Sequence, residues 1–435
     1  MTTPPRTLCS HLPSAAPGTA VTLEGWVHRR RELARITFVV LRDRSGFAQV
    51  VLPAGTAVPP EETTVRVTGT ATANEQAPGG VEVTGAVLEP LTEPAETSPA
   101  ELWRPSLDVS LPTLLDHAPV LWRHPAQRAR WQLAAASLRG FRSTLDGLGF
   151  TEVTTPKVVG TATESGANVF PVDWFGRPAY LAQSPQFYKQ QLVGVFERVY
   201  EVGPVFRAEP HDTVRHLAEY RSLDVELGSV RDHREVLTVL RDVLAGMVEA
   251  AASEEAAVAS TGASLPVVPN EVPVFHFADA LALAGAPADE PDLAPEHERA
   301  LGAWALAEHG SDFLAVEGYP MANRPFYTHP WTGDRPGTGA EAPAKWSNSF
   351  DLLFRGLELV TGGQRLHRAS DYERAIRARG EDPAAYDAYL QAFRHGMPPH
   401  GGFAIGLERW VGRLVGAANI REVTLFPRDL NRLSP

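Results

Sequence analysis

The sequence predicts an α+β protein with two domains: a small N-terminal β-barrel, and a larger domain built on a mostly antiparallel sheet with flanking helices. Three observations support this prediction. The chain has 435 residues, which is longer than a domain with a single hydrophobic core usually is. Short β-type runs fill its first 90 residues without helical periodicity. Further along, strand-like runs outnumber helices and do not alternate with them as βαβ units would.

The composition is that of a folded globular protein, with 43% hydrophobic and 21% charged residues. No apolar run approaches the roughly 20 residues that a membrane helix needs. The N-terminus carries no charged-then-apolar signal sequence, so we expect a cytoplasmic protein without a membrane partner. The single cysteine, Cys9, excludes an internal disulfide framework and any Cys-rich metal site. A net charge of −12 argues against a general polyanion binder, although a local basic patch can lie within an acidic protein.

Residues 1–17 are rich in Pro, Ser and Ala, and we expect them to form a tail. Five β-type runs separated by turn residues follow within residues 18–90. They are Val21–Val27, Ile36–Leu41, Phe47–Leu52, Thr64–Thr70 and Val81–Leu88. Five short strands without a helix favour the five-stranded oligonucleotide-binding (OB) barrel.

Arginines are concentrated in one part of the predicted barrel. Six arginines but only two acidic residues lie between His28 and Arg44, with Trp26 and Phe38 close by. Cations interleaved with aromatic rings suit unpaired nucleotides, because they supply counter-charge for phosphates and flat faces for bases. The alternative is a solvated strand edge beside aromatic residues of the core.

The second domain is expected to cover residues 119–435, after a proline-rich linker at residues 91–118. Apolar residues recur at spacings of three and four from Trp131 to Leu148, which predicts a helix. Strands are expected at Val199–Phe206, Ser222–Leu227, Phe313–Val316, Ser349–Phe354, Gly356–Val360 and Gly402–Ile405. The Ala-rich stretch at about 249–309 has a loose pattern and is interpreted as an insertion.

Three motifs in the second domain carry the functional signal. The first, at residues 149–156, is a helix exit that runs into a strand and ends at proline. The second combines Phe206-Arg-Ala-Glu209 with residues 215–220, and the third is Gly406-Leu-Glu-Arg409. In order and placement, this set resembles the three signature motifs of class II aminoacyl-tRNA synthetases. The resemblance implies the class II catalytic fold, use of ATP, and a homodimer formed through the first motif.

Such enzymes activate a carboxylic acid by attack on the α-phosphate of ATP, so they mainly need groups that position phosphates and neutralise their charge. The resemblance implies that Arg207 binds the α-phosphate and the substrate carboxylate, and that Arg409 meets the γ-phosphate. These two arginines are the candidate catalytic residues. The other candidate ATP contacts are Glu209, Arg215, His216, Leu217, Tyr220, Glu358, Gly406, Leu407 and Glu408. Taken singly, Arg207 with Glu209 would be a cross-strand ion pair, and Glu408 with Arg409 a solvated helix start.

Glu358 and Thr361 are candidate Mg²⁺ ligands, because Mg²⁺ prefers hard oxygen ligands and often takes only one or two from the protein. The glycines after Thr361 allow the backbone to come close to a ligand. The alternative is that Thr361-Gly-Gly363 is merely a turn between strands.

Residues 161–166 and 181–190 narrow the family, since they resemble aspartyl-tRNA synthetases of the compact archaeal type. The resemblance extends from Gly25-Trp-Val27 to Phe426-Pro427. The implied aspartate-binding residues are Glu164, Gln186, Lys189, Arg207, Asp224, Thr361 and Arg365. Lys189 is one of only three lysines in the chain. Two cations facing one carboxylate suit aspartate, whereas an asparagine amide would leave them under-paired. The alternative is that Lys189 is an ordinary surface lysine.

The barrel is then expected to bind the anticodon through Trp26, His28, Arg29, Phe38 and Pro78. Relatives that accept both aspartate and asparagine tRNAs carry His and Pro at the positions of His28 and Pro78. The resemblance therefore implies a non-discriminating enzyme that charges tRNA(Asp) and also tRNA(Asn), the latter for a separate tRNA-dependent amidotransferase.

Four alternatives remain open. An asparaginyl-tRNA synthetase would activate asparagine instead, and a strictly tRNA(Asp)-specific enzyme would reject tRNA(Asn). A synthetase-derived ligase that makes free asparagine would not need the barrel. A non-catalytic binding protein would not need Arg207, Glu358 and Arg409 together.

Overall fold

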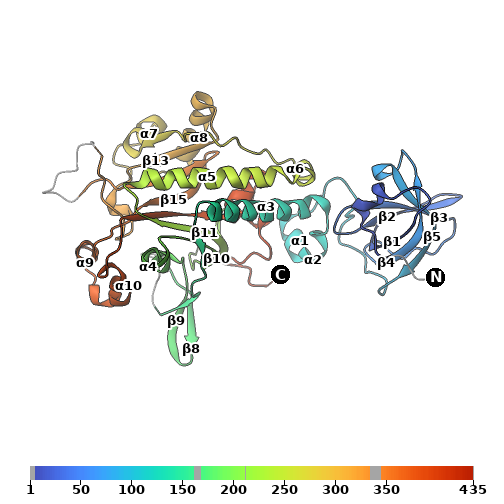
Figure 1. The fold of residues 1–435 in the computed structure, drawn as a ribbon, viewed down its shortest axis with the longest axis horizontal. Helices are drawn as coiled ribbons and strands as arrows, with labels where there is room; N and C mark the ends of the chain where they lie inside the picture. The colour runs from blue at the N-terminus through green and yellow to red at the C-terminus, as the bar shows by residue number, and fades with distance from the viewer. Residues whose placement is uncertain (1–4, 161–167, 211, 334–343, 435) are drawn as a thin grey trace. The chain divides into compact units, whose positions relative to one another are not determined.

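The computed structural model of the chain describes residues 5–160, 168–210, 212–333 and 344–434 (Figure 1). The chain divides into two compact units, Met1–Gln127 and Arg128–Pro435, and each is described here by itself. One contains a closed β-barrel and the other a mixed sheet with helices, so the predicted α+β class is confirmed.

The barrel consists of five strands in the order β1-β2-β3-β5-β4, closed by the pairing of β1 with β4. Their bounds are β1 Ala20–Glu32, β2 Ile36–Arg42, β3 Phe47–Pro53, β4 Thr64–Ala73 and β5 Val81–Pro90. Alternate residues of these strands, such as Leu23, Val39 and Val67, point inwards and are completely buried. The five expected strands are all present, and β1 continues through the arginines that follow His28.

Part of the expected tail is packed against the barrel instead of extending into solvent. Residues Cys9–Ser14 form a 3-10 helix, η1, whose Cys9 and Leu12 belong to the barrel core. The backbone N–H of Cys9 donates to the Asp43 carboxylate at 2.9 Å. Burial and the charge of Asp43 raise the pKa of the Cys9 thiol to about 12, so this cysteine stays protonated.

The proline-rich stretch has no regular structure before α1 (Leu111–Asp116), which is followed by α2 (Ala118–Leu121). The Ser110 hydroxyl caps α1 by accepting a bond from the backbone N–H of Thr113. Leu102, Leu114 and Leu121 form a small apolar cluster of their own.

The second unit is built on an eight-stranded sheet in the order β12-β13-β14-β15-β16-β11-β10-β6. The strands are β6 Thr151–Glu152, β10 Arg198–Phe206, β11 Glu219–Gly228, β12 Val274–His276, β13 Phe313–Glu317, β14 Ser349–Phe354, β15 Glu358–Gln364 and β16 His400–Gly406. The inner pairs are antiparallel, while β6 with β10 and β12 with β13 at the two edges are parallel. The prediction of a mostly antiparallel sheet is confirmed.

Two long helices, α3 (Pro125–Gly147) and α5 (His233–Ala252), run side by side along the sheet (Figure 1). They approach most closely where two glycines meet, since a Cβ atom on Gly140 would lie 2.3 Å from the carbonyl oxygen of Gly246. Phe141 and Leu145 of α3 belong to the main hydrophobic core of the second unit. Within the described residues, no helix has the length and apolarity needed to cross a membrane.

The Ala-rich stretch is part of the fold and does not form a loose insertion. It contains α6 (Glu255–Thr261), α7 (Phe277–Ala284) and α8 (Pro295–His309), and it supplies β12 to the edge of the main sheet. Leu281 and Leu301 pack with strand residues in a separate apolar cluster. These elements could not be recognised from the Ala-rich sequence, because alanine occurs at both buried and exposed positions of helices.

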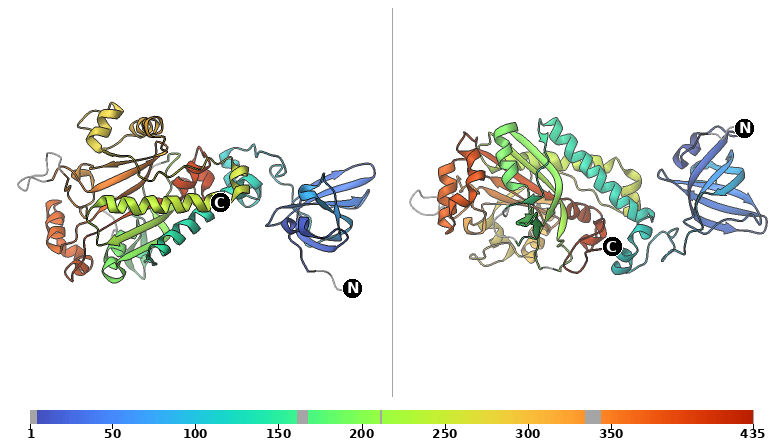
Figure 2. Two further views of the ribbon diagram at one scale, coloured as in Figure 1. Left: turned by 45° about the horizontal axis from the view of Figure 1, so that its top comes forward. Right: turned by 90° about the horizontal axis from the view of Figure 1, so that it is seen from below.

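The remaining elements are short. A small sheet contains β7 (Val158–Val159), β8 (Pro171–Trp174) and β9 (Arg177–Leu181), and α4 (Gln186–Phe196) follows it. Helices α9 (Ala369–Ala378) and α10 (Asp387–Phe393) lie together at one end of the sheet (Figure 2). The other elements are α11 (Leu407–Leu414) and the 3-10 helices η2 (Pro78–Gly80), η3 (Met321–Asn323), η4 (Pro383–Tyr386) and η5 (Ile420–Val423).

Candidate active site

A cavity of about 360 Å³ lies in the second unit, lined by α4, strands β11, β15 and β16, and the connection between β10 and β11. It gathers most of the candidate residues, including those of the second and third motifs, while no residue of the first motif (149–156) lines it. Those on its wall are Gln186, Lys189, Arg207, Glu209, Arg215, His216, Leu217, Tyr220, Asp224, Glu358, Thr361, Arg365, Gly406, Glu408 and Arg409.

Among the described candidates, one does not line this wall, and a further candidate cannot be placed. Glu164 lies outside the described residues. Leu407, at the first turn of α11, belongs to the main apolar core and is only 8% exposed. The side chains of consecutive residues at a helix start point in different directions, so Gly406 and Glu408 reach the cavity while the Leu407 side chain does not.

Lys189 is a buried cation on α4, with a relative exposure of 1%. Its ammonium Nζ lies 3.1 Å from Asp224 Oδ1 and 3.4 Å from Glu226 Oε2. It also donates to the carbonyl oxygens of Val225 and Phe403. The alternative of a surface lysine is therefore wrong, and Lys189 presents its charge to the inside of the cavity.

Arg365, directly after β15, is a second buried cation on the same wall. Its Nε donates to Glu226 Oε1 at 3.0 Å, and its Nη2 donates to the carbonyl of Gly402 at 3.0 Å. Burial alone raises the pKa of Glu226, but the charges of Arg365 and Lys189 outweigh it and hold that pKa below its usual value. Glu226 stays ionised and keeps both cations in place.

Glu226 was not among the residues predicted from the sequence, although β11 carries a signal for it. Ser222, Asp224 and Glu226 alternate along β11 and therefore share one face of the strand. All three are buried, and the Ser222 hydroxyl donates to Asp224 Oδ2 at 2.5 Å. A strand with a polar residue at every second position and buried neighbours between them indicates a polar site within the fold.

Arg207 and Glu209 follow β10 and line the cavity. The backbone N–H of Arg207 donates to the carbonyl of Ala218 at 2.9 Å, which brings the two ends of the β10–β11 connection together. The guanidinium of Arg207 lies 3.9 Å from Glu209, at the outer limit of an ion pair. The two residues lie on the same segment after β10, so the alternative of a cross-strand ion pair does not apply, and their 3.9 Å contact is too long for a hydrogen bond.

Arg409 approaches the cavity from α11 on the opposite side. Its Nη1 donates to the backbone carbonyl of Glu358 at 3.2 Å and lies 3.6 Å from the Glu358 carboxylate. Its neighbour Glu408 is 7% exposed and accepts from the backbone N–H of Arg221. Burial raises the pKa of Glu408 to about 7. The alternative of a solvated helix start is therefore wrong for Glu408, which ties α11 to β11.

Arg324 is a cavity residue that no motif indicated. It follows η3, donates to Asp351 Oδ2 at 2.8 Å, and its guanidinium lies 3.9 Å from the centre of the Tyr319 ring. Only the tertiary fold brings this loop arginine to the wall that Glu358 also lines.

The candidate metal ligands form a group of hard oxygens. Thr361 on β15 pairs in register with Asp351 on β14, and both Glu358 and Thr361 line the cavity. The buried Asp351 Oδ1 accepts no hydrogen bond from the described residues. Burial and the charge of Asp351 raise the pKa of Glu358 to about 7 against the opposing effect of Arg409. Water in the cavity weakens this effect, because 42% of the Glu358 side chain is exposed. These oxygens are of the kind that Mg²⁺ prefers, but each carboxylate has an arginine beside it, and the described residues contain no group of three or more His, Cys, Asp or Glu that could hold a metal.

In the barrel unit, the expected nucleic-acid residues fall into two groups. Trp26 and Phe38 are half-buried, Arg29 and Pro78 are exposed, and the Arg29 guanidinium lies 3.9 Å from the centre of the Trp103 ring. Trp26 and Phe38 are thus available on the barrel surface and do not belong to its core cluster.

His28, by contrast, is buried against neighbouring side chains. It is 7% exposed and occupies a bulge in β1, where the register with β2 shifts. Its Nδ1 lies 3.1 Å from Arg42 Nη1, and Arg42 forms a bidentate pair with Glu62. Burial and the charge of Arg42 lower the pKa of His28 to about 4, so the ring is neutral and accepts this bond. The expectation that its ring contacts a base directly does not fit this geometry.

Comparison with known proteins agrees with this arrangement. Residues 111–430 match the family of class II tRNA synthetases (D, K and N), and residues 21–91 match the OB-fold nucleic acid binding domain. The chain is 46% identical to an aspartate–tRNA(Asp/Asn) ligase from Thermus thermophilus, over 96% of this chain and 97% of the relative. It is 44% identical to an aspartate–tRNA(Asp/Asn) ligase from Deinococcus radiodurans over the full length of both.

A solved structure of similar fold is the asparaginyl-tRNA synthetase from Pyrococcus horikoshii complexed with asparaginyl-adenylate. It aligns with a TM-score of 0.88 at 28% identity, covering 99% of both chains. The matched family spans most of the second unit, and the relatives cover nearly the whole chain. This chain therefore belongs to the class II aminoacyl-tRNA synthetases of the D, K and N group.

Proposed function

We propose that the protein is an aspartate–tRNA ligase of relaxed tRNA specificity. It activates L-aspartate with ATP to aspartyl-adenylate and transfers the aspartyl group to tRNA(Asp) and tRNA(Asn). The observation that carries this proposal is the pair of buried cations, Lys189 and Arg365, on one wall of the cavity. The names of the Thermus and Deinococcus relatives support the same substrates.

The charges around Lys189 and Arg365 suit a small amino di-acid. The two cations bind the side-chain carboxylate of aspartate, while Asp224, with Gln186 nearby, binds its α-ammonium group. Asparagine would offer Lys189 and Arg365 a neutral amide, which compensates poorly for two desolvated charges. This argument favours aspartate over the asparaginyl alternative, although the folds of the two enzyme types are similar.

In the activation step, a carboxylate oxygen of aspartate attacks the α-phosphorus of ATP, and the bond to the β-phosphate breaks to release pyrophosphate. Arg207 holds the attacking carboxylate and the α-phosphate together, while Arg409 and Arg215 neutralise the departing pyrophosphate. Glu209 accepts from the adenine amino group. In the second step a ribose hydroxyl of the tRNA 3′ end attacks the adenylate carbonyl, and AMP leaves.

The metal proposed for this site is Mg²⁺. When bound, it neutralises negative charge on the ATP phosphates. Glu358 and Thr361 would hold it, and this assignment is supported by the unbonded oxygen of Asp351, the residue that pairs in register with Thr361. Arg409 keeps Glu358 oriented through its bond to the Glu358 carbonyl.

The barrel binds the anticodon, with Trp26 and Phe38 as stacking surfaces and Arg29 as a phosphate contact. We assign His28 an indirect role, since its ring orients Arg42. Pro78 shapes the turn before β5. Charging tRNA(Asn) with aspartate leaves a product that a tRNA-dependent amidotransferase has to convert. The enzyme acts in the cytoplasm as a homodimer that associates through α3 and β6.

The decisive experiment compares aspartate and asparagine in ATP–pyrophosphate exchange, then charges separate transcripts of tRNA(Asp) and tRNA(Asn) with labelled aspartate. Exchange driven by aspartate and comparable charging of both tRNAs are expected. Exchange driven only by asparagine would establish the asparaginyl alternative. A preference for tRNA(Asp) of about a hundredfold, roughly 3 kcal/mol, would establish a strictly specific enzyme.

A further inference from the structure

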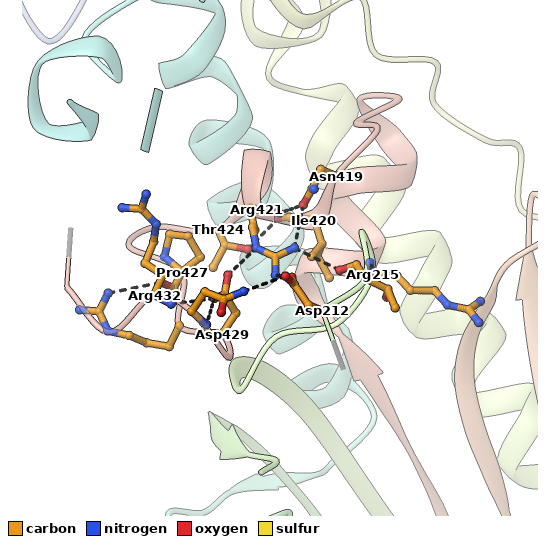
Figure 3. A network of polar contacts seen from close by, with 12 residues as sticks. Asp212, Arg215, Asn419, Ile420, Arg421, Thr424, Pro427, Asp429 and Arg432 are labelled. Atoms are coloured by element: carbon orange, nitrogen blue, oxygen red, sulfur yellow. Dashed lines mark hydrogen bonds and ion pairs between the residues drawn. The ribbon is translucent and has the colours of Figure 1, made fainter. Parts of the chain in front are cut away.

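A cluster of charged side chains beside the cavity has no part in the reaction described above. It is centred on Arg421 of η5, which is only 8% exposed (Figure 3). The cluster joins two parts of the chain that are far apart in sequence. One is the C-terminal segment, residues 419–432. The other is the later part of the connection between β10 and β11, residues 212–218, which we call the β10–β11 loop.

The guanidinium of Arg421 uses all three of its nitrogen atoms in this cluster. Towards the β10–β11 loop, Nη2 donates to Asp212 Oδ1 at 2.9 Å and Nη1 donates to the carbonyl of Thr213 at 3.1 Å. Within the C-terminal segment, Nε donates to Asp429 Oδ2 at 2.5 Å. Burial raises the pKa of Asp429, but the Arg421 bond and two backbone N–H groups outweigh it and keep that carboxylate ionised.

Backbone contacts hold the same two segments together on either side of Arg421. The N–H of Ile420 donates to the carbonyl of Val214, and the N–H of Ala218 donates to the carbonyl of Arg428, each at 2.8 Å. The Asn431 side chain donates to the second oxygen of Asp212, also at 2.8 Å. The C-terminal segment therefore anchors both the start and the end of the loop.

This anchoring matters because the middle of the loop carries two of the proposed ATP contacts. Arg215 points away from the Arg421 cluster (Figure 3), and both Arg215 and His216 line the cavity. Ile420, the residue before Arg421, lines the cavity as well. Ordering a loop costs conformational entropy, and a loop that is already ordered avoids this cost when the ligand binds.

We infer that Arg421 is a positioning residue that fixes the β10–β11 loop so that Arg215 and His216 are in place before ATP arrives. The C-terminal segment thereby sets the affinity for ATP, a conclusion that rests on the function proposed above. Aspartate affinity should not depend on Arg421, because Lys189, Asp224 and Arg365 lie on α4, β11 and the end of β15, and no hydrogen bond described for these three residues comes from Arg421.

The test compares two variants of the full-length enzyme, Arg421→Lys and Asp212→Ala. Lysine keeps the charge but cannot bind three acceptors in one plane. Asp212 is half-exposed, so its removal spares the core and provides a variant that folds if Arg421→Lys does not. ATP–pyrophosphate exchange is measured with varied ATP and with varied aspartate, and the Kd for ATP is measured by calorimetry without aspartate.

We expect the KM and the Kd for ATP to rise about tenfold in both variants, with the KM for aspartate unchanged. The double variant should be little worse than either single one, since both changes break the same contact. Hydrogen exchange in residues 212–218 should become faster, while exchange in β11 should not change.

Arg130→Lys is the matched control. Arg130 binds Glu422, the residue after Arg421, at 3.3 Å and has a side-chain exposure of 19%, but its described bonds go to Glu422 and not to the β10–β11 loop. It should leave both KM values as in the wild type. Unchanged ATP affinity in Asp212→Ala, or an equal rise in the KM for aspartate, would overturn the inference. A wild-type enzyme without aspartate-dependent exchange would instead overturn the proposed function, and the calorimetric Kd would still test the role of Arg421.

Discussion

Lys189 shows how its surroundings define the chemistry of a single residue. An ammonium group in water has no preference among carboxylates, but a desolvated one is costly to leave unpaired, and Asp224 and Glu226 pair with it in the structure. In the proposed complex Asp224 binds the α-ammonium group of the ligand, so the side-chain carboxylate of aspartate takes over part of this pairing. The specificity for aspartate is therefore expected to depend on this one nitrogen atom more than on the shape of the cavity.

Replacing Lys189 with Gln should reduce kcat/KM for aspartate in pyrophosphate exchange by about a thousandfold, roughly 4 kcal/mol. It should not create activity with asparagine, because Arg365 still presents a charge. Lys157→Gln is the control: Lys157 also forms an ion pair, with Glu201 at 2.7 Å, but does not line the cavity. A Lys189 variant that activates aspartate normally would contradict the proposed binding mode.

Glu317 provides a prediction for stability at low pH. Burial raises its pKa, but hydrogen bonds from His233 and Arg234 lower it to about 2. A carboxylate with a depressed pKa stabilises the fold above its unfolded pKa of 4.5, and this contribution is lost as the pH falls from 4.5 to about 2. Glu317→Gln should therefore cost about 3 kcal/mol of unfolding free energy at pH 7.

Urea unfolding of wild type and Glu317→Gln at several pH values measures this effect. The difference between the two proteins should shrink steadily below pH 4.5. The exposed Glu308, near the end of α8, provides the control Glu308→Gln, which should not change the pH dependence. A constant difference across the pH range would show that Glu317 does not stabilise the fold as an ionised group.

Among the elements, helices α3 and α5 depend on glycine for their close contact. Gly140 has no room for a side chain against the backbone of Gly246, whereas Gly147 at the end of the same helix has nothing within 4 Å of its would-be Cβ. The two positions therefore form a pair for comparison, in which Gly147 is the last residue of α3 and gains less than an interior position from the helix preference for alanine.

Gly140→Ala should destabilise the second unit by about 3 kcal/mol, because the helices have to separate around the new methyl group. Gly147→Ala should be neutral or stabilising by up to about 1 kcal/mol. Thermal unfolding followed by circular dichroism distinguishes the two variants. Equal melting temperatures would mean that the helix contact adapts without loss.

In the molecule as a whole, the two units are expected to bind different ligands: the barrel binds the tRNA anticodon, and the second unit binds aspartate and ATP. The net charge of −12 disfavours nucleic acid in general, yet the exposed arginines after His28 give the barrel a local positive surface. Amino-acid activation needs only the second unit's cavity. Anticodon binding and adenylate formation should therefore respond to different substitutions.

Replacing both Arg29 and Arg31 with Gln should raise the KM for tRNA about tenfold at physiological salt, since phosphate contacts are lost. Pyrophosphate exchange with aspartate should be unchanged. Arg66→Gln is the control within the barrel, because Arg66 is already paired with Glu24 and Glu89. An unchanged KM for tRNA would contradict the proposed binding surface.

The sequence by itself determined the elements whose patterns are local. Alternating apolar residues specified the five barrel strands and most of the central sheet, and regular spacing specified α3. Motifs with fixed order indicated Arg207, Glu358 and Arg409, which the structure brings to one cavity. In the alanine-rich stretch, however, buried and exposed positions do not differ in hydrophobicity, so its helices and β12 were not recognised.

Only the tertiary structure decided which groups come close together across long sequence separations. Glu226 pairs with Arg365, Arg324 reaches the cavity from a loop, and Arg421 joins the C-terminal segment to Asp212. It also buried His28 beside Arg42, at a bulge in β1. Ion pairs form between atoms a few ångströms apart in space, and the spacing of residues along the chain does not contain that distance.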